Sequence, residues 1–317
     1  MGNVIAFDIG GTRFRAGLFD PEGHRLSILE NPTNRQGGRN WMLEQLRACF
    51  LTLRDKSEGP VQSCGVSFGG PVNYDHQTVT SIHVPGWEEF ALGKWLEEAF
   101  DVPCCLDNDA NAGALGEHRF GAGRGCRTMI YITISTGIGG GIILDGKLHR
   151  GKDSLAGEIG HIPVSDSGVL CSCGARGCLE TFCSGSAIAL RGREWGRRRP
   201  EAVTRMTELS GGSVEDITAK ALVQAAAEGN EAARQILIEA SRWLARALMT
   251  AIRILNPERI VLGGGVAQAG SLLLNPVDEA LEALGSPTIH YSTEVCLAEL
   301  GSDSPLYGAA AMALELG

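Results

Sequence analysis

Four potential metal ligands lie close together near the middle of the 317-residue chain. His161, Cys171, Cys173 and Cys178 are separated by 10, 2 and 5 positions in the segment EIGHIPVSDSGVLCSCGARGCLE. Thiolate and imidazole ligands at such short spacing are typical of a closed tetrahedral Cys3His zinc site. Because the protein would fill every ligand position, we expect this zinc to hold a loop rather than to activate water. Core thiols beside a solvent-facing histidine are the weaker alternative.

Three glycine-rich turns follow short apolar segments. The first comprises Asp8, Gly10, Gly11 and Thr12 in the sequence DIGGT. A carboxylate at a strand end suits a hydrated Mg²⁺, and glycine amides can donate hydrogen bonds to phosphate oxygens, although a plain tight hairpin would use the same residues. The second turn, STGIGGG, favours the phosphate interpretation and contributes Thr136 and Gly137. The third offers flat backbone for a nucleotide base or ribose at Gly263, Gly264 and Gly265.

Neither phosphate-sized turn has the lysine of a Walker A loop, and the GxGxxG fingerprint is absent. P-loop and Rossmann folds are therefore excluded.

A carboxylate lies where a strand passes into a helix, in the segment LDNDANAGALGE. The helix N-terminus would keep Asp109 ionised, as a general base for a hydroxyl should be. An aspartate here could be only a helix cap, but Asp107 or Asn108 could cap equally well. Glu158 and Glu180 flank the candidate zinc loop and could accept sugar hydroxyls, or they could be solvated surface charges.

The elements that must position these residues alternate between strand and helix. An apolar strand from Val4 to Asp8, a glycine turn and a returning strand from Phe14 to Phe19 open the chain, and a second copy of this pattern spans Thr128 to Leu148. Helical spacing of apolar residues follows from Trp41 to Leu53 and from Ala91 to Phe100. We therefore predict an α/β protein built from two related halves.

Composition narrows the function classes. The chain has 28 Lys plus Arg against 37 Asp plus Glu, a net charge of −9, which argues against binding to nucleic acid. It has no basic leader and no apolar stretch of the ~18 residues that a membrane span requires, so we expect a cytoplasmic protein without membrane contact. In a reducing compartment the ten cysteines would be free thiols, metal ligands or catalytic groups rather than disulfides.

Taken together, these motifs resemble the ROK family, which groups repressors, open reading frames and sugar kinases. The resemblance extends from DIGGT to the terminal helix, and the motif CxCGxxGCLE is its most specific part. It implies a two-lobed actin-like ATPase (ribonuclease H-like) fold with an interlobe cleft. The implied lobes are residues 1–119, joined by the last helix at 304–317, and residues 120–303 with the zinc loop.

The resemblance also implies roles for particular residues. Asp109 matches the catalytic base, and the sugar-binding positions would be Gly70, His83, Asn108, Asp109, Glu158, His161 and Glu180. His161 would ligate zinc through one ring nitrogen and face the sugar with the other edge. The segment that approaches the sugar reads HVPGW where family sugar kinases often have NLPGW, which bears on sugar identity.

The function implied is ATP-dependent phosphorylation of a hexose at the C6 hydroxyl, with Mg²⁺ as cofactor and structural Zn²⁺. Glucose is the first choice of substrate, and fructose, mannose, N-acetylglucosamine and N-acetylmannosamine remain open. The alternative of another class is a ROK-type sugar-sensing regulator without a DNA-binding module, against which the intact Asp109 and both phosphate turns argue. Because the first strand begins at Val4, we expect no DNA-reading module of the kind that the repressors carry. Apolar helices around Trp195 and Trp243 predict a homodimer, unless both tryptophans fill the core of their own lobe.

Overall fold

The computed structural model describes residues 2–81, 84–166 and 168–317, which form two compact units. The first unit contains residues 1–125, 141–157 and 303–317, and the second contains residues 126–140 and 158–302. Residues 141–157 belong to the first unit because they contact it: Arg150 donates to Asp107 at 2.7 Å, and Ser154 accepts from the amide of Tyr74 at 3.4 Å. The predicted division between residues 119 and 120 stays a prediction.

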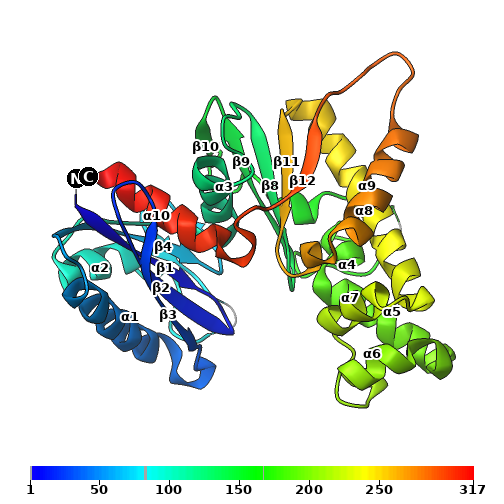
Figure 1. The fold of residues 1–317 in the computed structure, drawn as a ribbon, viewed down its shortest axis with the longest axis horizontal. Coiled ribbons are helices and arrows are strands. Elements are labelled where there is room, and N and C mark those ends of the chain that lie inside the picture. Colours follow the sequence, from blue (N-terminus) through cyan, green and yellow to red (C-terminus); the bar gives the residue numbers. More distant parts are fainter. Residues whose placement is uncertain (1, 82–83, 167) are drawn as a thin grey trace. The chain divides into compact units, whose positions relative to one another are not determined.

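The first unit is built on a mixed five-stranded sheet of order β3-β2-β1-β4-β7 (Figure 1). Strands β1, β2 and β3 pair antiparallel, whereas β4 pairs parallel to β1 and β7 parallel to β4. A separate two-stranded ribbon joins β5 to β6. The strands are β1 (Asn3–Ile9), β2 (Arg13–Phe19), β3 (Arg25–Pro32), β4 (Val61–Phe68), β5 (Val72–Asn73), β6 (Thr78–Val79) and β7 (Cys104–Asn108).

Helices cover both faces of this sheet. Alternate strand residues such as Ile5 and Phe7 face a buried cluster with α1 (Gly38–Asp55) and α2 (Leu92–Phe100). The opposite face packs against α10 (Ser304–Leu316), where the Ser63 hydroxyl donates to the Ala313 carbonyl at 2.7 Å. Helix α3 (Asp109–Phe120) packs beside α10. Figure 1 shows α10 on one side of the sheet and α1 and α2 on the other.

The second sheet repeats the strand order of the first, as β10-β9-β8-β11-β12. Strand β10 is antiparallel to β9, and β11 is parallel to both β8 and β12. This repetition confirms the expected strand–turn–strand hairpin in both halves of the chain. The strands are β8 (Met129–Ile134), β9 (Ile138–Leu144), β10 (Lys147–His149), β11 (Arg259–Gly263) and β12 (Glu294–Leu297).

Helices of the second unit bury a separate core around Ile130, Leu244 and Leu262. Short 3-10 turns, η1 to η6, connect several elements, among them η2 (Ile159–His161) and η5 (Val266–Ala269). Within the described residues, no helix is both long enough and apolar enough to cross a membrane. The α-helices of this unit are α4 (Glu180–Cys183), α5 (Gly185–Arg198), α6 (Thr204–Leu209), α7 (Ala219–Ala227), α8 (Glu231–Leu255) and α9 (Ser271–Leu284).

Candidate active site

The carboxyl ends of β1, β4 and β7 bring three polar positions into line. Asp8 pairs in register with Ser67, and Ser67 pairs with Asp107 on the next strand. The Asp8 carboxylate accepts from the Ser67 hydroxyl at 3.0 Å and from the Arg15 guanidinium at 2.6 Å. Arg15 is buried and also donates to Asp303 at 2.6 Å. Asp8 is therefore fixed by a buried cation that the motif itself did not reveal.

The helix that follows β7 carries the predicted base. Asn108 caps α3 because its side chain accepts from the Asn111 amide at 2.7 Å, so Asp109 is not needed as the cap. Asp109 is the first residue of α3 and is exposed. A Cβ placed on Gly69 would lie 4.0 Å from an oxygen of Asp109, which puts this carboxylate beside the turn after β4. The helix N-terminus favours its ionised form.

A buried ion pair supports this strand end. Asp107 is 2% exposed and accepts from Arg150 at 2.7 Å, from the Asn111 side chain at 2.8 Å and from the amide of Asn108 at 2.8 Å. Arg150 stacks over the Tyr74 ring, 3.5 Å from its centroid. The sequence offered no signal for the ion pair, because its two partners are 43 positions apart.

The first glycine turn presents amides rather than carbonyls. The carbonyl of Gly10 accepts from the Thr33 hydroxyl at 2.8 Å, that of Gly11 from Arg35 at 2.6 Å, and that of Thr12 from the Thr33 amide at 2.9 Å. In the part of the chain that the structure describes, the amides of Gly11 and Thr12 donate to no protein acceptor. Free amides beside satisfied carbonyls can bind an anion such as phosphate.

The second turn has the same character. The carbonyl of Ser135 accepts from the Gly185 amide at 2.7 Å, and that of Thr136 from the Ser186 amide at 3.3 Å. The amides of Thr136 and Gly137 have no protein acceptor among residues 2–81, 84–166 and 168–317. Two equivalent β-hairpins therefore both end in turns that can bind phosphate.

A cavity of about 600 Å³ in the second unit opens beside this turn. Thr136 and Gly265 line it, so two of the three predicted nucleotide segments reach one pocket. Gly263 and Gly264 precede Gly265, and Gly264 adopts a φ of +85° that favours glycine. Arg193 and Lys220 add positive charge that sequence reasoning missed; the other lining residues are Ser135, Gly185, Ser186, Ala189, Thr218, Ala219, Val266 and Gln268.

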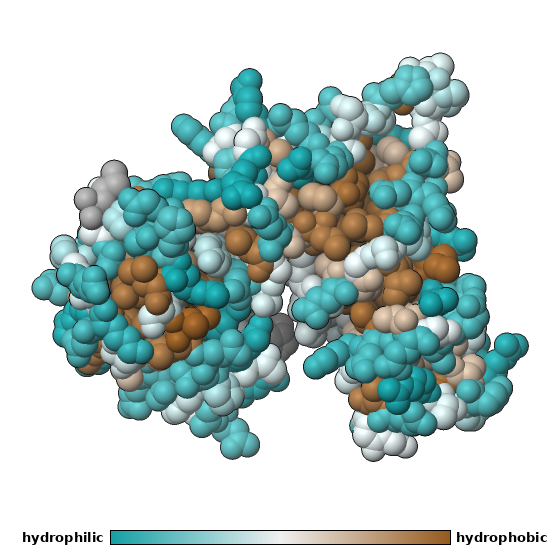
Figure 2. Space-filling model, in the orientation of Figure 1, coloured by the Kyte–Doolittle hydropathy of each residue, from teal (hydrophilic) through white to brown (hydrophobic). Residues whose placement is uncertain are grey.

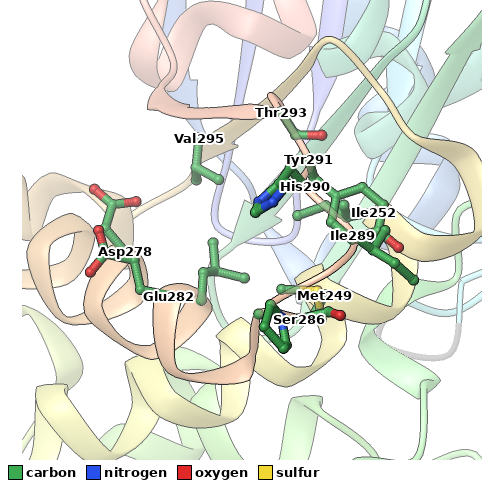
Figure 3. Close-up of a pocket in the computed structure, with 13 residues that line it drawn as sticks. Met249, Ile252, Asp278, Glu282, Ser286, Ile289, His290, Tyr291, Thr293 and Val295 are labelled. Atoms are coloured by element: carbon green, nitrogen blue, oxygen red, sulfur yellow. The ribbon is translucent and has the colours of Figure 1, made fainter.

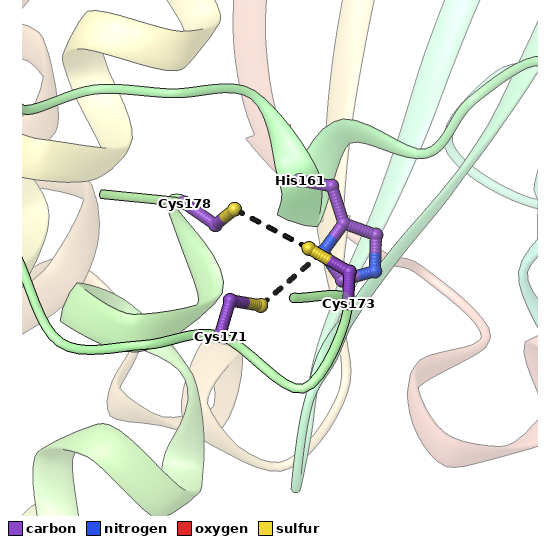
Figure 4. A group of neighbouring side chains, drawn as sticks. All are labelled: His161, Cys171, Cys173 and Cys178. Carbon is purple, nitrogen blue, oxygen red and sulfur yellow. Dashed lines mark hydrogen bonds between the residues drawn. The ribbon is translucent and has the colours of Figure 1, made fainter. Parts of the chain in front are cut away.

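The four predicted metal ligands converge (Figure 4). One ligand atom from each of His161, Cys171, Cys173 and Cys178 lies within 4.8 Å of the others. Nδ1 of His161 is 3.5 Å from Sγ of Cys171, and the sulfurs of Cys173 and Cys178 are 3.7 Å apart. Tetrahedral zinc with ordinary bond lengths would place such atoms about 3.5 Å and about 3.8 Å apart. The chemistry and spacing of these side chains therefore fit a zinc ion.

The surroundings of this cluster shift the pKa values of two of its thiols. Burial raises the pKa of Cys178 to about 12, whereas a backbone hydrogen bond from Ala175 lowers the pKa of Cys173. The Nε2 atom of His161 lies 3.8 Å from the Glu158 carboxylate, while its Nδ1 atom faces the thiols. The two ring nitrogens thus face different partners.

The remaining predicted sugar-binding residues fall in different places. The segment that carries Cys171, Cys173 and Cys178 is called the metal loop, and Glu180 begins α4 directly after it. The Glu180 carboxylate accepts from the Ile138 amide at 2.9 Å. Gly70 lies in the turn after β4, where a Cβ would be 2.7 Å from the Thr80 carbonyl. His83 lies outside the described residues.

A second cavity, of about 650 Å³, contains none of the predicted site residues (Figure 3). It lies among α8, α9 and the segment that leads into β12, and its lining mixes Met249 and Ile252 with Asp278, Glu282 and His290. Burial, followed by the charge of Glu282, raises the pKa of Asp278. The cavity shares no lining residue with the pocket beside Thr136.

When the strands of each five-stranded sheet are counted in chain order, both sheets have the same spatial order, third, second, first, fourth and fifth. This duplicated order and the paired glycine hairpins define the ribonuclease H-like, actin-type ATPase class. Residues 4–316 match the ROK family, and the chain belongs to it. It is 33% identical over 316 residues to a glucokinase from Streptomyces coelicolor, covering 99% of this chain and 98% of that protein. It is 34% identical over 313 residues to a glucokinase from Thermotoga maritima, with coverages of 98% and 97%.

A solved structure extends the comparison from sequence to fold. The structure of a ROK family glucokinase from Streptomyces griseus in complex with glucose and AMPPNP superposes with a TM-score of 0.88. The two chains are 34% identical, and the match covers 100% of each. These findings confirm the predicted family and fold.

Proposed function

We propose that this protein is an ATP-dependent glucokinase that transfers the γ-phosphoryl group of ATP to the C6 hydroxyl of glucose. The observation that carries the proposal is the pair of hairpin turns whose carbonyls are bound and whose amides at Gly11, Thr12, Thr136 and Gly137 are free. Free backbone amides can neutralise charge on phosphoryl oxygens without having to reorganise during the reaction. The relatives of the whole chain that are named above are glucokinases.

Asp109 would act as the general base. The C6 oxygen attacks the γ-phosphorus, its proton passes to the Asp109 carboxylate, and the bond to the ADP oxygen breaks. Asn108 supports this role because it supplies the cap of α3, so that Asp109 is not needed as the cap. Asp8 is partly exposed and would hold a hydrated Mg²⁺, which supplies positive charge to the phosphates when bound.

The second unit would supply the nucleotide pocket and part of the sugar site. Thr136 and Gly265 line the pocket proposed for ATP, where Arg193 and Lys220 favour an anionic ligand. The carboxylates of Glu158 and Glu180 would accept hydrogen bonds from sugar hydroxyls, and His161 would form a further hydrogen bond with the sugar. The Cys3His cluster would hold a structural zinc, whose ligand His161 would present Nε2 toward the sugar.

A panel of sugars in a coupled ADP-release assay tests the function. Glucose should give the highest kcat/KM among glucose, fructose, mannose, N-acetylglucosamine and N-acetylmannosamine. A different best sugar would reassign the substrate. If no sugar releases ADP, the kinase proposal fails.

We also infer a cytoplasmic homodimer with no nucleic-acid partner. No disulfide joins any of the ten cysteines, all of which lie in the described part of the chain, and this suits a reducing compartment. Trp195 and Trp243 are half-buried against the core of their own unit, so they contribute less to a dimer face than the sequence suggests.

Hydrophobic surface remains over β12 and α9 in the second unit (Figure 2). In the same unit, Ile254 near the end of α8 and Ile289 between α9 and β12 are 74% and 55% exposed. Light scattering at micromolar concentration should give about twice the 33.6 kDa chain mass. A single species of one chain mass would refute the dimer.

A further inference from the structure

The 135–138 turn comprises the three residues between β8 and β9 together with Ile138, the first residue of β9, and one short segment binds it at both ends. Gly185 and Ser186, the first residues of α5, donate their amides to the carbonyls of Ser135 and Thr136. On the other side of the turn, the Ile138 amide donates to the Glu180 carboxylate at 2.9 Å. A stretch of seven residues, 180–186, therefore contacts the turn from both ends.

Glu180 is the one of these partners that acts through its side chain. Its contact with the turn is close, because a Cβ added to Gly137 would lie 2.4 Å from the same carboxylate oxygen. A side chain at position 137 would therefore force the Glu180 carboxylate to move. A hydrogen bond to an ionised acceptor is stronger than one to a neutral acceptor.

The metal loop fixes where Glu180 lies. Glu180 is two residues beyond the ligand Cys178, and between them Leu179 is fully buried and donates its amide to the Ile162 carbonyl at 2.9 Å. The Ser172 hydroxyl, between two further ligands, donates to the other Glu180 oxygen at 3.5 Å. The carboxylate is therefore tied at one oxygen to the metal loop and at the other to the turn.

We propose that Glu180 is a positioning residue for the nucleotide: it holds the 135–138 turn against the metal loop, so that nucleotide affinity depends on the metal loop even when no sugar is bound. This inference rests on the proposed function only for the identity of the ligand. It differs from the sugar contact expected of Glu180, because it makes a prediction for the sugar-free protein.

Two substitutions separate these roles. Glu180→Gln keeps a side-chain carbonyl that can accept from Ile138, whereas Glu180→Ala removes the acceptor. Titration calorimetry of Mg·ADP into the full-length, zinc-loaded protein without sugar should show affinity lowered about tenfold or more in Glu180→Ala. Glu180→Gln should stay within about threefold of wild type. Glu194→Ala, an exposed glutamate of α5 that pairs with Arg191, is the matched control and should leave the affinity unchanged.

A double-mutant cycle tests the contact itself. Gly137→Ala forces its new methyl group against the Glu180 oxygen and should weaken Mg·ADP binding. In the Glu180→Ala background the same change should cost much less, because its obstacle is gone. Additive losses would overturn the proposed contact.

Hydrogen exchange of the Ile138 amide gives a readout that needs no ligand. We expect exchange to accelerate in Glu180→Ala and in wild-type protein stripped of metal by a chelator, but not in Glu194→Ala. Unchanged exchange in Glu180→Ala, or Mg·ADP affinity equal to or tighter than wild type, would overturn the inference. If wild-type protein binds no Mg·ADP, the proposed function fails, and the exchange experiment still decides whether Glu180 positions the turn.

Discussion

Replacing Arg15 with methionine should show how much the stability of the first unit depends on one buried cation. The Arg15 side chain is 3% exposed and joins Asp8, which is 16% exposed, to Asp303, which is 28% exposed. Methionine fills a similar unbranched space but leaves both carboxylates without this partner. The change removes charge pairing from the end of β1 and from the start of α10 together.

The expected loss can be worked from these contacts. Removing one partner of a buried ion pair costs about 3–5 kcal/mol. Asp8 keeps the Ser67 hydroxyl at 3.0 Å and Asp303 keeps Arg25 at 2.5 Å, so we expect the lower end, about 3 kcal/mol. Arg13→Met on the same strand is the control, because Arg13 is 47% exposed and its pair with Glu30 should contribute about 0–1 kcal/mol.

Urea unfolding followed by circular dichroism measures both variants against wild type. The Arg15→Met curve should shift to lower urea with an unchanged slope, while Arg13→Met should nearly superpose on wild type. An Asp303→Asn variant should lose part of the same stability, and the double variant should lose less than the sum. If the free energies of unfolding of Arg15→Met and Arg13→Met differ by less than about 0.5 kcal/mol, the buried ion pair does not stabilise this unit.

Three further predictions concern the base, the metal and the second cavity. Asp109→Asn should lower turnover by ~10²–10⁴ while calorimetry still detects sugar binding; near-normal turnover would reduce Asp109 to a structural residue. Cys173→Ser should lower both the zinc content, measured by elemental analysis, and the affinity for sugar. The control Cys296→Ser, on β12, should leave both unchanged. Wild-type protein without zinc would contradict the metal site.

Because the folded pKa of Asp278 is raised, its ionised form opposes folding at neutral pH, so Asp278→Asn should raise the melting temperature there. This gain should fade as pH falls through the raised pKa of the folded state and should be gone below the carboxyl's ordinary value of about 4; a gain that persists below that value would contradict the assigned cause.

The sequence predicted those parts of the molecule whose chemistry is local. Four metal ligands occur within eighteen residues, so a single loop can bring them together, and the structure does so. Both glycine turns sit between strands that are adjacent in the chain, and their type follows from short-range pattern. The sequence pattern did not predict strand β3, because most of its residues alternate between partly buried and exposed positions. It did not predict β12 either, because this strand has only four residues.

Tertiary structure decided which distant residues support those local motifs. Arg15 and Asp303 are 288 positions apart, and Glu180 and Ile138 are 42 apart. The first pair meets because α10 returns to the first sheet beside β2, and the second because α4 packs against the turn before β9; no local spacing encodes either contact. The sequence by itself therefore predicted the clustering of the four His and Cys side chains, the two glycine turns and the place of Asp109 at the start of a helix. The packed structure determined the partners that hold Asp8, Asp107 and Glu180 in place.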